Sequence, residues 1–356
     1  MKQIDLIYRT MIAELGQRLL DASFMADFPT DGRFVAVTVK QRRYWYFDQP
    51  DGAGGQSRRY VGPADDLEIT RRVDEFRSIK DDAKARRKLV STLTRDAGLI
   101  APDIFTGNVI EALANAGLFR LRACLVGTVA FQAYSAYLGV RLPAASILTG
   151  DADIAQDFAI SAEVGDTLPP ITEILQSVDP SFRAIPHASG SHASTAFRND
   201  SGYRVEFLTG NRGSDDYTGK PSKMPALGGA SADPLRFLDF LIYEPVRTVL
   251  LHKSGVSVIV PDPARFAVHK VIVAARRAVD GHNEMKRDKD LMQAGILFEA
   301  LTETGRRDSL AAAIEEALGR GEGWRDTIKA GIGLMPGAIR QKVAPEFEAL
   351  GLDLTK

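Results

Sequence analysis

Two aspartates separated by one residue, and a glutamate about fifty residues further on, have the types and spacing of a metal site. Asp151 and Asp153 lie in the segment ILTGDADIA and Glu206 in YRVEFLT, and both segments are typical of strands. Side chains alternate along a strand, so the two aspartates share a face, and Glu206 reaches them if its strand is adjacent. Carboxylates held together repel each other, and a divalent cation removes that penalty. Asp-x-Asp alone, however, is more often a solvated strand end.

A small-residue turn precedes these strands and favours a phosphate ligand. Gly127-Thr128 ends the predicted strand at about 119–126 and comes just before a predicted helix at about 129–138. A glycine there lets the backbone approach a ligand, and the N–H groups at a helix start attract phosphate. Thr128 either adds a hydroxyl contact or serves as the helix N-cap. The ordered set of turn, Asp-x-Asp strand and third acid is more informative than any one of its parts.

This set resembles the nucleotidyltransferase superfamily related to DNA polymerase beta, which has a small-residue turn, an acid-x-acid strand and a third acid. Here the motif reads Gly127-Thr128 and then Thr149-Gly150-Asp151-Ala152-Asp153. The resemblance is closest to bacterial families that include the AbiEii-type toxins and an uncharacterised nucleotidyltransferase-fold family, and it covers about residues 106–300. It continues through Pro261-Asp262-Pro263, Phe266 to Lys270, Arg276-Arg277, Lys286 and Lys289-Asp290.

The resemblance implies that Asp151 and Asp153 hold Mg²⁺ or Mn²⁺. It implies that Glu206 completes the metal site or receives the proton of the attacking hydroxyl. The reaction expected from it is transfer of a nucleoside monophosphate from an NTP to an acceptor hydroxyl, with release of pyrophosphate. Such a reaction asks mainly for positioning and charge neutralisation.

The same resemblance implies that Gly127 and Thr128 contact the nucleotide phosphates and that Lys270 neutralises charge on the triphosphate. Asp290 is included as a catalytic-support residue because of the Lys-Asp pair. The alternative for Lys270, and equally for Arg277 seven residues later, is a solvated helix face.

Three polar residues of the predicted C-terminal helices can also be explained without a functional role. Lys286, Lys289 and Asp290 also fit a polar helix stripe with ordinary pairing at three- and four-residue spacing.

Two histidines flank the segment ASGS before the Glu206 strand. His187 and His192 could place this loop against the base or the triphosphate of a nucleotide. A surface loop is the favoured interpretation, because no carboxylate stands at ligand spacing from them.

The segment from Arg33 to Tyr60 predicts a small antiparallel sheet that is basic and aromatic. It contains six basic residues against two acidic ones, a net charge of +4, with Tyr44, Trp45, Tyr46 and Tyr60 among them. Basic side chains follow phosphates and aromatic rings stack on bases, so this sheet is a candidate surface for an RNA or protein acceptor. The alternative is that one face packs on helices while the arginines solvate the other.

The composition excludes several classes of protein. The 356 residues are 45% hydrophobic, carry a net charge of -1 and include one cysteine, Cys124. These values exclude collagen-like, disordered and disulfide-rich chains and a cysteine-based zinc site. No apolar run is long enough to span a membrane, so a cytoplasmic protein without a membrane partner is expected.

The predicted fold class is α/β or α+β, with a nucleotidyltransferase core around a mixed sheet. An N-terminal helix-plus-sheet module over 1–105 precedes the core at 106–262, and a C-terminal helical domain follows at 263–356. Residues 211–233 are predicted as a long loop and residues 247–261 as a hairpin.

Three functions remain open from the sequence. The first is an enzyme acting on RNA or protein, in a toxin or defence setting. The second is a small-molecule nucleotidyltransferase, and the third is an inactive module that binds NTP or nucleic acid. The intact set of three acids argues against the third. The base of the NTP, the oligomeric state and any cognate antitoxin are not determined by the sequence.

Overall fold

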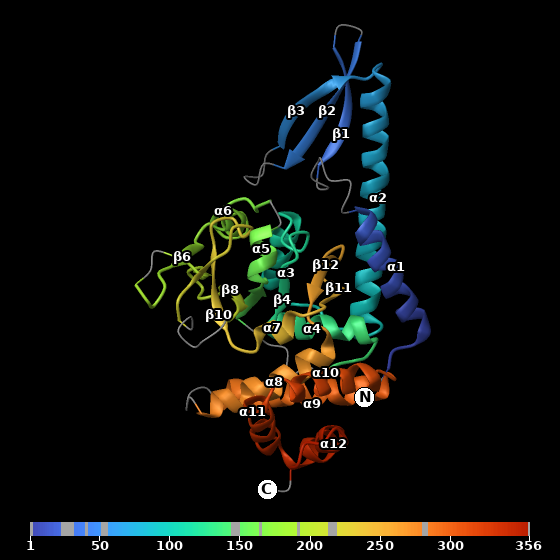
Figure 1. Cartoon of the computed structure of the whole chain (residues 1–356). Helices are drawn as coiled ribbons and strands as arrows, with labels where there is room; N and C mark the ends of the chain where they lie inside the picture. Colours follow the sequence, from blue (N-terminus) through green and yellow to red (C-terminus); the bar gives the residue numbers. More distant parts are fainter. Residues whose placement is uncertain are drawn as a thin grey trace.

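A computed structural model of the chain describes residues 3–22, 32–39, 42–50, 56–143, 150–163, 166–190, 193–212, 219–279 and 284–354. It contains an N-terminal unit of helices and a sheet, a body around a second sheet, and a group of C-terminal helices (Figure 1). The predicted fold class, a mixed α/β fold with a helical C-terminal region, is confirmed. The predicted domain boundaries at 105/106 and 262/263 stay predictions.

The N-terminal unit is built on one long helix. Its elements are α1 (Leu6–Ala22), β1 (Arg33–Val39), β2 (Arg42–Pro50), β3 (Gln56–Pro63) and α2 (Leu67–Arg95). The strands form the predicted antiparallel sheet, in the order β1-β2-β3. The sheet lies beside one end of α2, away from the body, and α1 lies along the other end (Figure 1).

Alternation along β2 explains how this sheet packs. Trp45 and Phe47 are buried, whereas Tyr44 and Tyr46, which alternate with them, are half-buried. The ring of Phe76 on α2 lies 5.7 Å from that of Phe47 and meets it edge-on. The Trp45 indole N–H donates to the Thr70 hydroxyl at 3.0 Å. One face of the sheet is therefore held on α2 by aromatic contacts.

The body surrounds a mixed sheet in which the strands of the predicted site are central. Its elements are α3 (Ile104–Asn115), β4 (Cys124–Val126), α4 (Gly127–Leu138), β5 (Asp151–Ala155), α5 (Phe158–Glu163), α6 (Ile171–Gln176), β6 (Arg183–Ile185), β7 (Ala196–Arg198), β8 (Arg204–Gly210), β9 (Ser222–Lys223), β10 (Ser231–Leu235), α7 (Leu238–Ile242), β11 (Val246–Leu250) and β12 (Val256–Val260). The strand order is β4-β5-β8-β10-β9, with β7 also paired to β8 and β6 to β7. Strand β5 is antiparallel to β4 and parallel to β8, which is also parallel to β10.

The predicted long loop at 211–233 was wrong in part, because β9 and the beginning of β10 lie within it. Strand β10 reads SADPL and lacks the β-branched and aromatic residues that mark a strand. It pairs with β8 through tertiary contact, which single-sequence propensity does not reveal. The predicted strand at 119–126 is shorter than expected, since its first residues form a turn and β4 begins at Cys124.

The predicted hairpin is confirmed as β11 and β12. Gly255 in its turn has φ +86°, which glycine adopts without strain. The turn also contacts the N-terminal unit, because the Arg86 guanidinium of α2 donates to the Ser254 carbonyl at 3.2 Å.

The C-terminal region is helical, as predicted. It consists of α8 (Pro263–Val279), α9 (Glu284–Glu303), α10 (Arg307–Gly319), α11 (Glu322–Gly333) and α12 (Gly337–Glu348). Helices α8 and α9 lie side by side beneath the body (Figure 1) and share its hydrophobic core through residues such as Phe266, Val271 and Leu297. Among the described helices, none is both long enough and apolar enough to cross a membrane.

Candidate functional site

The three predicted carboxylates lie on one face of the central sheet. In the parallel register of β5 and β8, Asp153 is paired with Glu206 and Asp151 with Arg204. Paired residues of neighbouring strands point to the same side, so all three acids share a face. The residues between them, Ala152 and Val205, are fully buried on the opposite side. The hydrophobic alternation of two strands therefore turns the acids away from the core.

The surroundings of Asp153 favour a positively charged ligand. Burial, together with the nearby carboxylates of Asp151 and Glu206, raises the pKa of Asp153 to about 7. Among the described residues, no hydrogen-bond donor or ion-pair partner contacts its carboxylate. A positive charge placed here would remove the repulsion that raises the pKa.

Glu206 is engaged differently. Its Oε1 atom lies 2.7 Å from the Arg204 guanidinium, two residues earlier on the same face of β8. Within the described part of the chain, no three acidic, histidine or cysteine side chains are arranged to enclose a metal ion. Mg²⁺ is commonly held by one or two carboxylates together with phosphate oxygens of the substrate. The donor chemistry of Asp151 and Asp153 fits that arrangement, and Glu206 as a third ligand stays a prediction.

Gly127 is required by the position of Asp153. Its φ is +67°, and a Cβ atom built on it would lie 2.3 Å from the Asp153 Oδ2 atom. Strand β4 pairs with β5 so that Val126 stands opposite Asp153, which places the end of β4 directly beside this carboxylate. A larger residue at position 127 would be strained and would displace the acid.

The first turn of α4 begins at the same point. Its N-cap is Val126, which makes no side-chain capping bond, and no acidic residue lies in the first turn. Thr128 is inside the helix, so its interpretation as the N-cap was wrong. A helix start without a capping side chain leaves N–H donors for an anionic ligand. The phosphate contacts of Gly127 and Thr128 stay predictions.

Three lysines on the C-terminal helices stand opposite the acids. The charges of Lys270 on α8 and Lys286 on α9 lower the pKa of Asp153, against the effects that raise it. Burial and the charge of Lys270 lower the pKa of Lys289, which Asp151 and Asp290 raise in turn. The acidic sheet face and the lysines of α8 and α9 are therefore close enough to interact. Lys286 and Lys289 were not among the predicted site residues, although their three-residue spacing indicated a shared face.

Asp290 organises the lysine side of the site. It is buried, and its carboxylate accepts hydrogen bonds from Lys270 Nζ at 2.5 Å and Arg277 Nε at 2.9 Å. The structure thus brings together three of the residues singled out on α8 and α9. Its contacts are those of a residue that positions Lys270, and a catalytic-support role for Asp290 stays a prediction.

A family model described as nucleotidyltransferase matches residues 105–319, which is more than half of the chain. The chain belongs to this nucleotidyltransferase family. The match covers the turn, the acidic strands and the lysine helices together. No curated protein and no solved structure matches the chain at a significant level.

The histidine loop of this nucleotidyltransferase is tied to the same sheet. His187 Nε2 lies 2.9 Å from Asp233 Oδ1 on β10, and Thr195 donates to the other carboxylate oxygen at 2.8 Å. The Ser189 hydroxyl lies 2.7 Å from His187 Nδ1. This network holds the loop on β10, and Asp233 was the carboxylate that sequence reasoning missed. His192 lies outside the described residues.

Two basic residues of the N-terminal sheet, Arg58 and Arg33, share one acidic partner, Asp48. Asp48 is buried and accepts from Arg58 at 2.6 Å and 2.7 Å, with Arg33 at 4.0 Å. Arg58 also lies 5.9 Å from the centre of the Tyr46 ring. The side chains of Lys40, Arg42, Arg59 and Tyr60 lie outside the description. An acceptor surface on this sheet stays a prediction.

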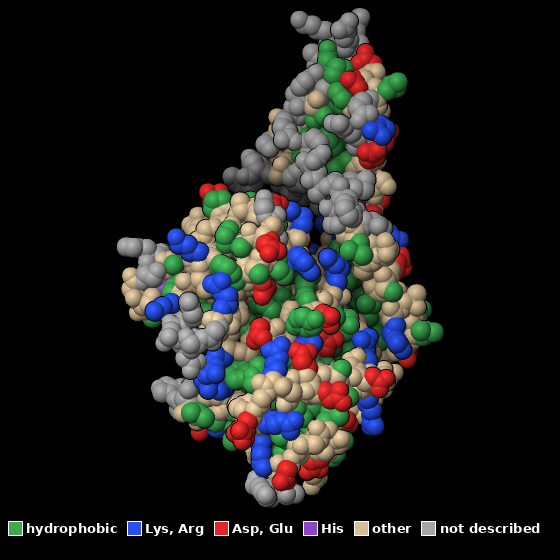
Figure 2. Space-filling view, in the orientation of Figure 1, with side chains coloured by type: hydrophobic (Ala, Val, Ile, Leu, Met, Phe, Trp, Pro, Cys, Tyr) green, Lys and Arg blue, Asp and Glu red, His purple; other side chains and the backbone are tan. Residues whose placement is uncertain are grey.

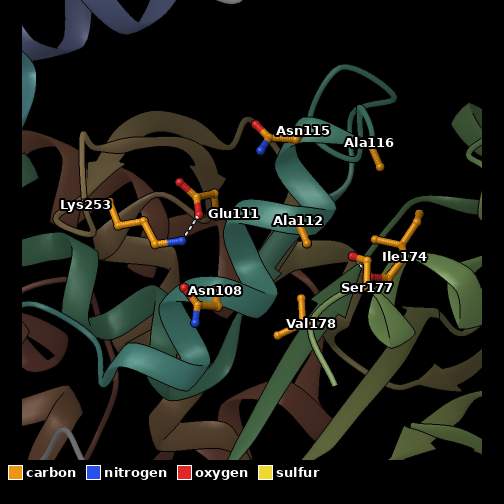
Figure 3. Close-up of a pocket in the computed structure, with 9 residues that line it drawn as sticks. All are labelled: Asn108, Glu111, Ala112, Asn115, Ala116, Ile174, Ser177, Val178 and Lys253. Carbon is orange, nitrogen blue, oxygen red and sulfur yellow. Dashed lines mark hydrogen bonds and ion pairs between the residues drawn. The ribbon is translucent and has the colours of Figure 1, made fainter. Parts of the chain in front are cut away.

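A cavity of about 620 Å³ lies apart from the acids, between α3, α6 and the β11–β12 turn (Figure 3). At its edge, Lys253 Nζ is 2.5 Å from Glu111, so these two charges satisfy each other. None of the predicted site residues lines it. On the face of the molecule shown in Figure 2, acidic and basic side chains are interspersed over the body, in keeping with the near-zero net charge.

Proposed function

We propose that this nucleotidyltransferase moves a nucleoside monophosphate from an NTP to an acceptor hydroxyl in a reaction that depends on Mg²⁺ or Mn²⁺. The acceptor oxygen attacks the α-phosphorus and forms the new P–O bond. The bond to the bridging oxygen of pyrophosphate breaks, and pyrophosphate leaves with that electron pair. The acceptor proton passes to a carboxylate of the sheet, for which Glu206 is the candidate.

One observation carries the proposal: the carboxylates of Asp151 and Asp153, on one face of the sheet, lie within electrostatic reach of lysines on two helices. Like charges are costly when held together, and such an arrangement is stable only when a ligand supplies the complement. A metal ion with a triphosphate supplies both signs at once. The cation neutralises Asp151 and Asp153, and the triphosphate neutralises the lysines.

Each part of the chain then has a separate task. Asp151 and Asp153 would hold the metal, which would polarise the phosphoryl oxygens when bound. The start of α4 at Gly127 and Thr128 would orient the phosphates. Lys270, held by Asp290, would offset negative charge on the departing pyrophosphate.

We further propose that the acceptor is a macromolecule, either the 3′ end of an RNA or a protein side chain. The N-terminal unit supports this, because a basic and aromatic sheet outside the family match would have no role with a small acceptor. A small-molecule acceptor is the alternative. A toxin or defence setting, with likeness to the AbiEii-type families, belongs to the same proposal.

The test is transfer of label from each of the four α-³²P-labelled NTPs, with Mg²⁺ or Mn²⁺, to total RNA, to lysate protein or to a small-molecule fraction. Wild type is compared with Asp153→Asn. The matched control is Asp166→Asn, which removes an exposed carboxylate that pairs with Arg120 on the surface. Loss of a metal ligand worth several kcal/mol predicts about a 10³-fold slower transfer for Asp153→Asn and no change for the control.

The fraction that carries the label identifies the acceptor class. Label confined to small molecules would refute the macromolecular acceptor but keep the transfer reaction. Binding of NTP that survives Asp153→Asn, with no transfer by wild type to any fraction, would instead identify an inactive binding module.

A further inference from the structure

Three arginines form a row across the strands that follow the acids in the sheet. In the antiparallel registers, Arg198 of β7 is paired with Arg204 of β8, and Arg183 of β6 is paired with Arg198. Arg204 is in turn paired with Asp151 of β5. Paired residues point to the same side, so the three arginines lie on the acidic face of the sheet. The row therefore starts beside Asp151 and leads outward to β6, at the outer side of the body (Figure 1).

The arginines stand where their charges repel one another. All three are exposed, and like charges directly opposite each other on neighbouring strands destabilise a sheet. Charges that only protect a sheet from edge-to-edge association are needed on the edge strand alone. Among the described strands β6 pairs only with β7, so two of the three arginines lie further in. A negatively charged ligand explains the row better than protection of the edge.

Nearby acids balance only part of this charge. Arg183 pairs with Asp200, which is an exposed acid. Arg204 pairs with Glu206. Between them, Arg198 has no hydrogen-bond or ion-pair partner among the described residues. Exposed ion pairs are worth at most about 1 kcal/mol, so a ligand with several phosphates can replace them.

The length of the row indicates a ligand with a series of charges. Neighbouring strands lie about 4.8 Å apart, so the row extends about 10 Å from β8 to β6. Successive phosphates of one strand of a duplex are about 3.4 Å apart along its axis, so such a row faces more than one of them. Proteins that bind single strands use positively charged grooves that follow the backbone in this way.

The row and the phosphate-binding turn flank the acids from opposite sides. The strand order β4-β5-β8 puts Gly127 and the start of α4 on the β4 side of Asp153, whereas the arginines lie on the β8 side. In an in-line transfer, the attacking and the leaving oxygens lie on opposite sides of the phosphorus. Pyrophosphate that leaves on the α4 side is thus compatible with an acceptor that enters along the arginines.

We propose that Arg183, Arg198 and Arg204 hold the phosphate backbone of a single-stranded polynucleotide and lead its 3′ end to the acids. The inference rests on the proposed function and narrows its acceptor to a nucleic-acid strand rather than a protein. The terminal 3′ oxygen attacks the α-phosphorus of the NTP and forms the new P–O bond. Pyrophosphate leaves with the electron pair of the broken bond, the proton passes to a carboxylate of the sheet, and the strand gains one nucleotide.

The experiment measures binding of 5′-fluorescent RNA and DNA strands of about 12 nucleotides to the full chain by anisotropy, with Mg²⁺ and without NTP. The double variant Arg183→Ala/Arg198→Ala leaves Arg204 and its pairing with Glu206 in place. We expect its Kd to be about 100-fold higher than that of wild type at low salt, about tenfold for each charged contact. The salt dependence of log K should fall by about 1.4, because each phosphate contact to a single strand contributes about 0.7.

A matched variant and a modified strand make the result specific. Arg247→Ala removes the same charge from an exposed arginine of β11, in a separate sheet, and is expected to leave Kd unchanged. Methylphosphonate linkages next to the 3′ end remove the backbone charges that the row would contact. They should weaken binding to wild type but change binding to the double variant by about twofold or less, since the two changes remove the same contacts. Methylphosphonates next to the 5′ end are the control.

Wild type that binds neither strand, or a double variant that binds like wild type, would overturn the inference. Transfer of labelled NMP to protein, measured in parallel, would then show that the transfer reaction is intact with another acceptor. The comparison of RNA with DNA identifies which of the two strands supplies the backbone. Binding that depends on the arginines, without transfer to any fraction, would instead contradict the proposed function and with it the assignment of the strand as acceptor.

Discussion

The N-terminal unit and the surroundings of Asp153 in the body use charged side chains in different ways. In the N-terminal unit, acids and bases meet directly: Asp48 accepts from Arg58, and Asp82 accepts from Arg18 and Arg86. In the body, Asp153 has no such partner among the described residues, although lysines lie within electrostatic reach. Paired charges fix a structure, whereas charges of opposite sign that are kept apart prepare a place for a ligand that carries both signs.

The buried pairing of Asp290 predicts the largest effect. Asp290→Asn removes the negative charge that pairs with Lys270 and Arg277 and one of its two acceptor oxygens, and breaking a buried ion pair in this way costs about 3–5 kcal/mol of unfolding free energy. Lys270 would also lose its fixed position, so KM for the NTP rises. Urea unfolding and steady-state kinetics measure the two effects, with the exposed Asp288→Asn as control. Unchanged KM would assign Asp290 a structural role only.

The raised pKa of Asp153 predicts an unusual dependence on pH. Between about pH 4 and pH 7 the folded protein keeps a proton that the unfolded chain has lost, so stability falls as the pH rises through this window. At pH 8 without metal, Asp153→Asn is therefore more stable than wild type, by at most about 4 kcal/mol. At pH 4 the two are alike, and Mg²⁺ with NTP narrows the difference at pH 8. Denaturant unfolding at both pH values checks this, and a variant less stable at pH 8 would contradict it.

The contact between Gly127 and Asp153 predicts a paired result for two glycines. Gly127→Ala is expected to cost about 1–3 kcal/mol of stability and to slow transfer, because the new methyl group displaces the acid. Gly150→Ala is the control, since a Cβ there meets nothing within 4 Å. Thermal unfolding and the transfer assay compare them. Equal behaviour of the two variants would show that Asp153 does not need the close approach.

The ion pairs of the N-terminal unit predict a change in stability without a change in chemistry. Although burial opposes ionisation, hydrogen bonds from Arg18 and Arg86 hold the pKa of Asp82 below its usual value. The stability that Asp82 contributes is thus present above its ordinary pKa and lost as the pH falls below it. Asp82→Asn is expected to cost about 1–2 kcal/mol at pH 7 and to leave transfer to a short acceptor unchanged. A slower transfer by Asp82→Asn would contradict the conclusion that the ion pairs of the N-terminal unit serve stability alone.

The smallest effect concerns the ion pair between Glu206 and Arg204 on β8. Arg204→Ala frees Glu206 from its ion pair, which is worth at most about 1 kcal/mol on a partly exposed surface. If Glu206 is the third metal ligand, Mg²⁺ with NTP binds up to about fivefold more tightly to the variant. Titration with Mg²⁺ at fixed NTP measures this. Unchanged affinity would remove Glu206 from the metal site.

Several features followed from the sequence because their causes are local. The alternation in DADIA and RVEFL placed Asp151, Asp153 and Glu206 on polar strand faces, and the Gly255 turn marked the β11–β12 hairpin. The turn at Gly127 was recognised for the same reason, since glycine is suited to a positive φ. Local pattern failed for β10, where pairing with β8 outweighs a weak strand propensity.

The sequence by itself indicated which residues are candidates for the chemistry, and it determined which strand face each acid takes, because side-chain alternation is a property of one strand. Only the tertiary structure decided that Asp153 stands beside Glu206 and that Lys286 and Lys289 lie within electrostatic reach of the acids. These are relations between segments far apart in the chain. They depend on strand register and helix packing, which the burial of the whole core sets at once.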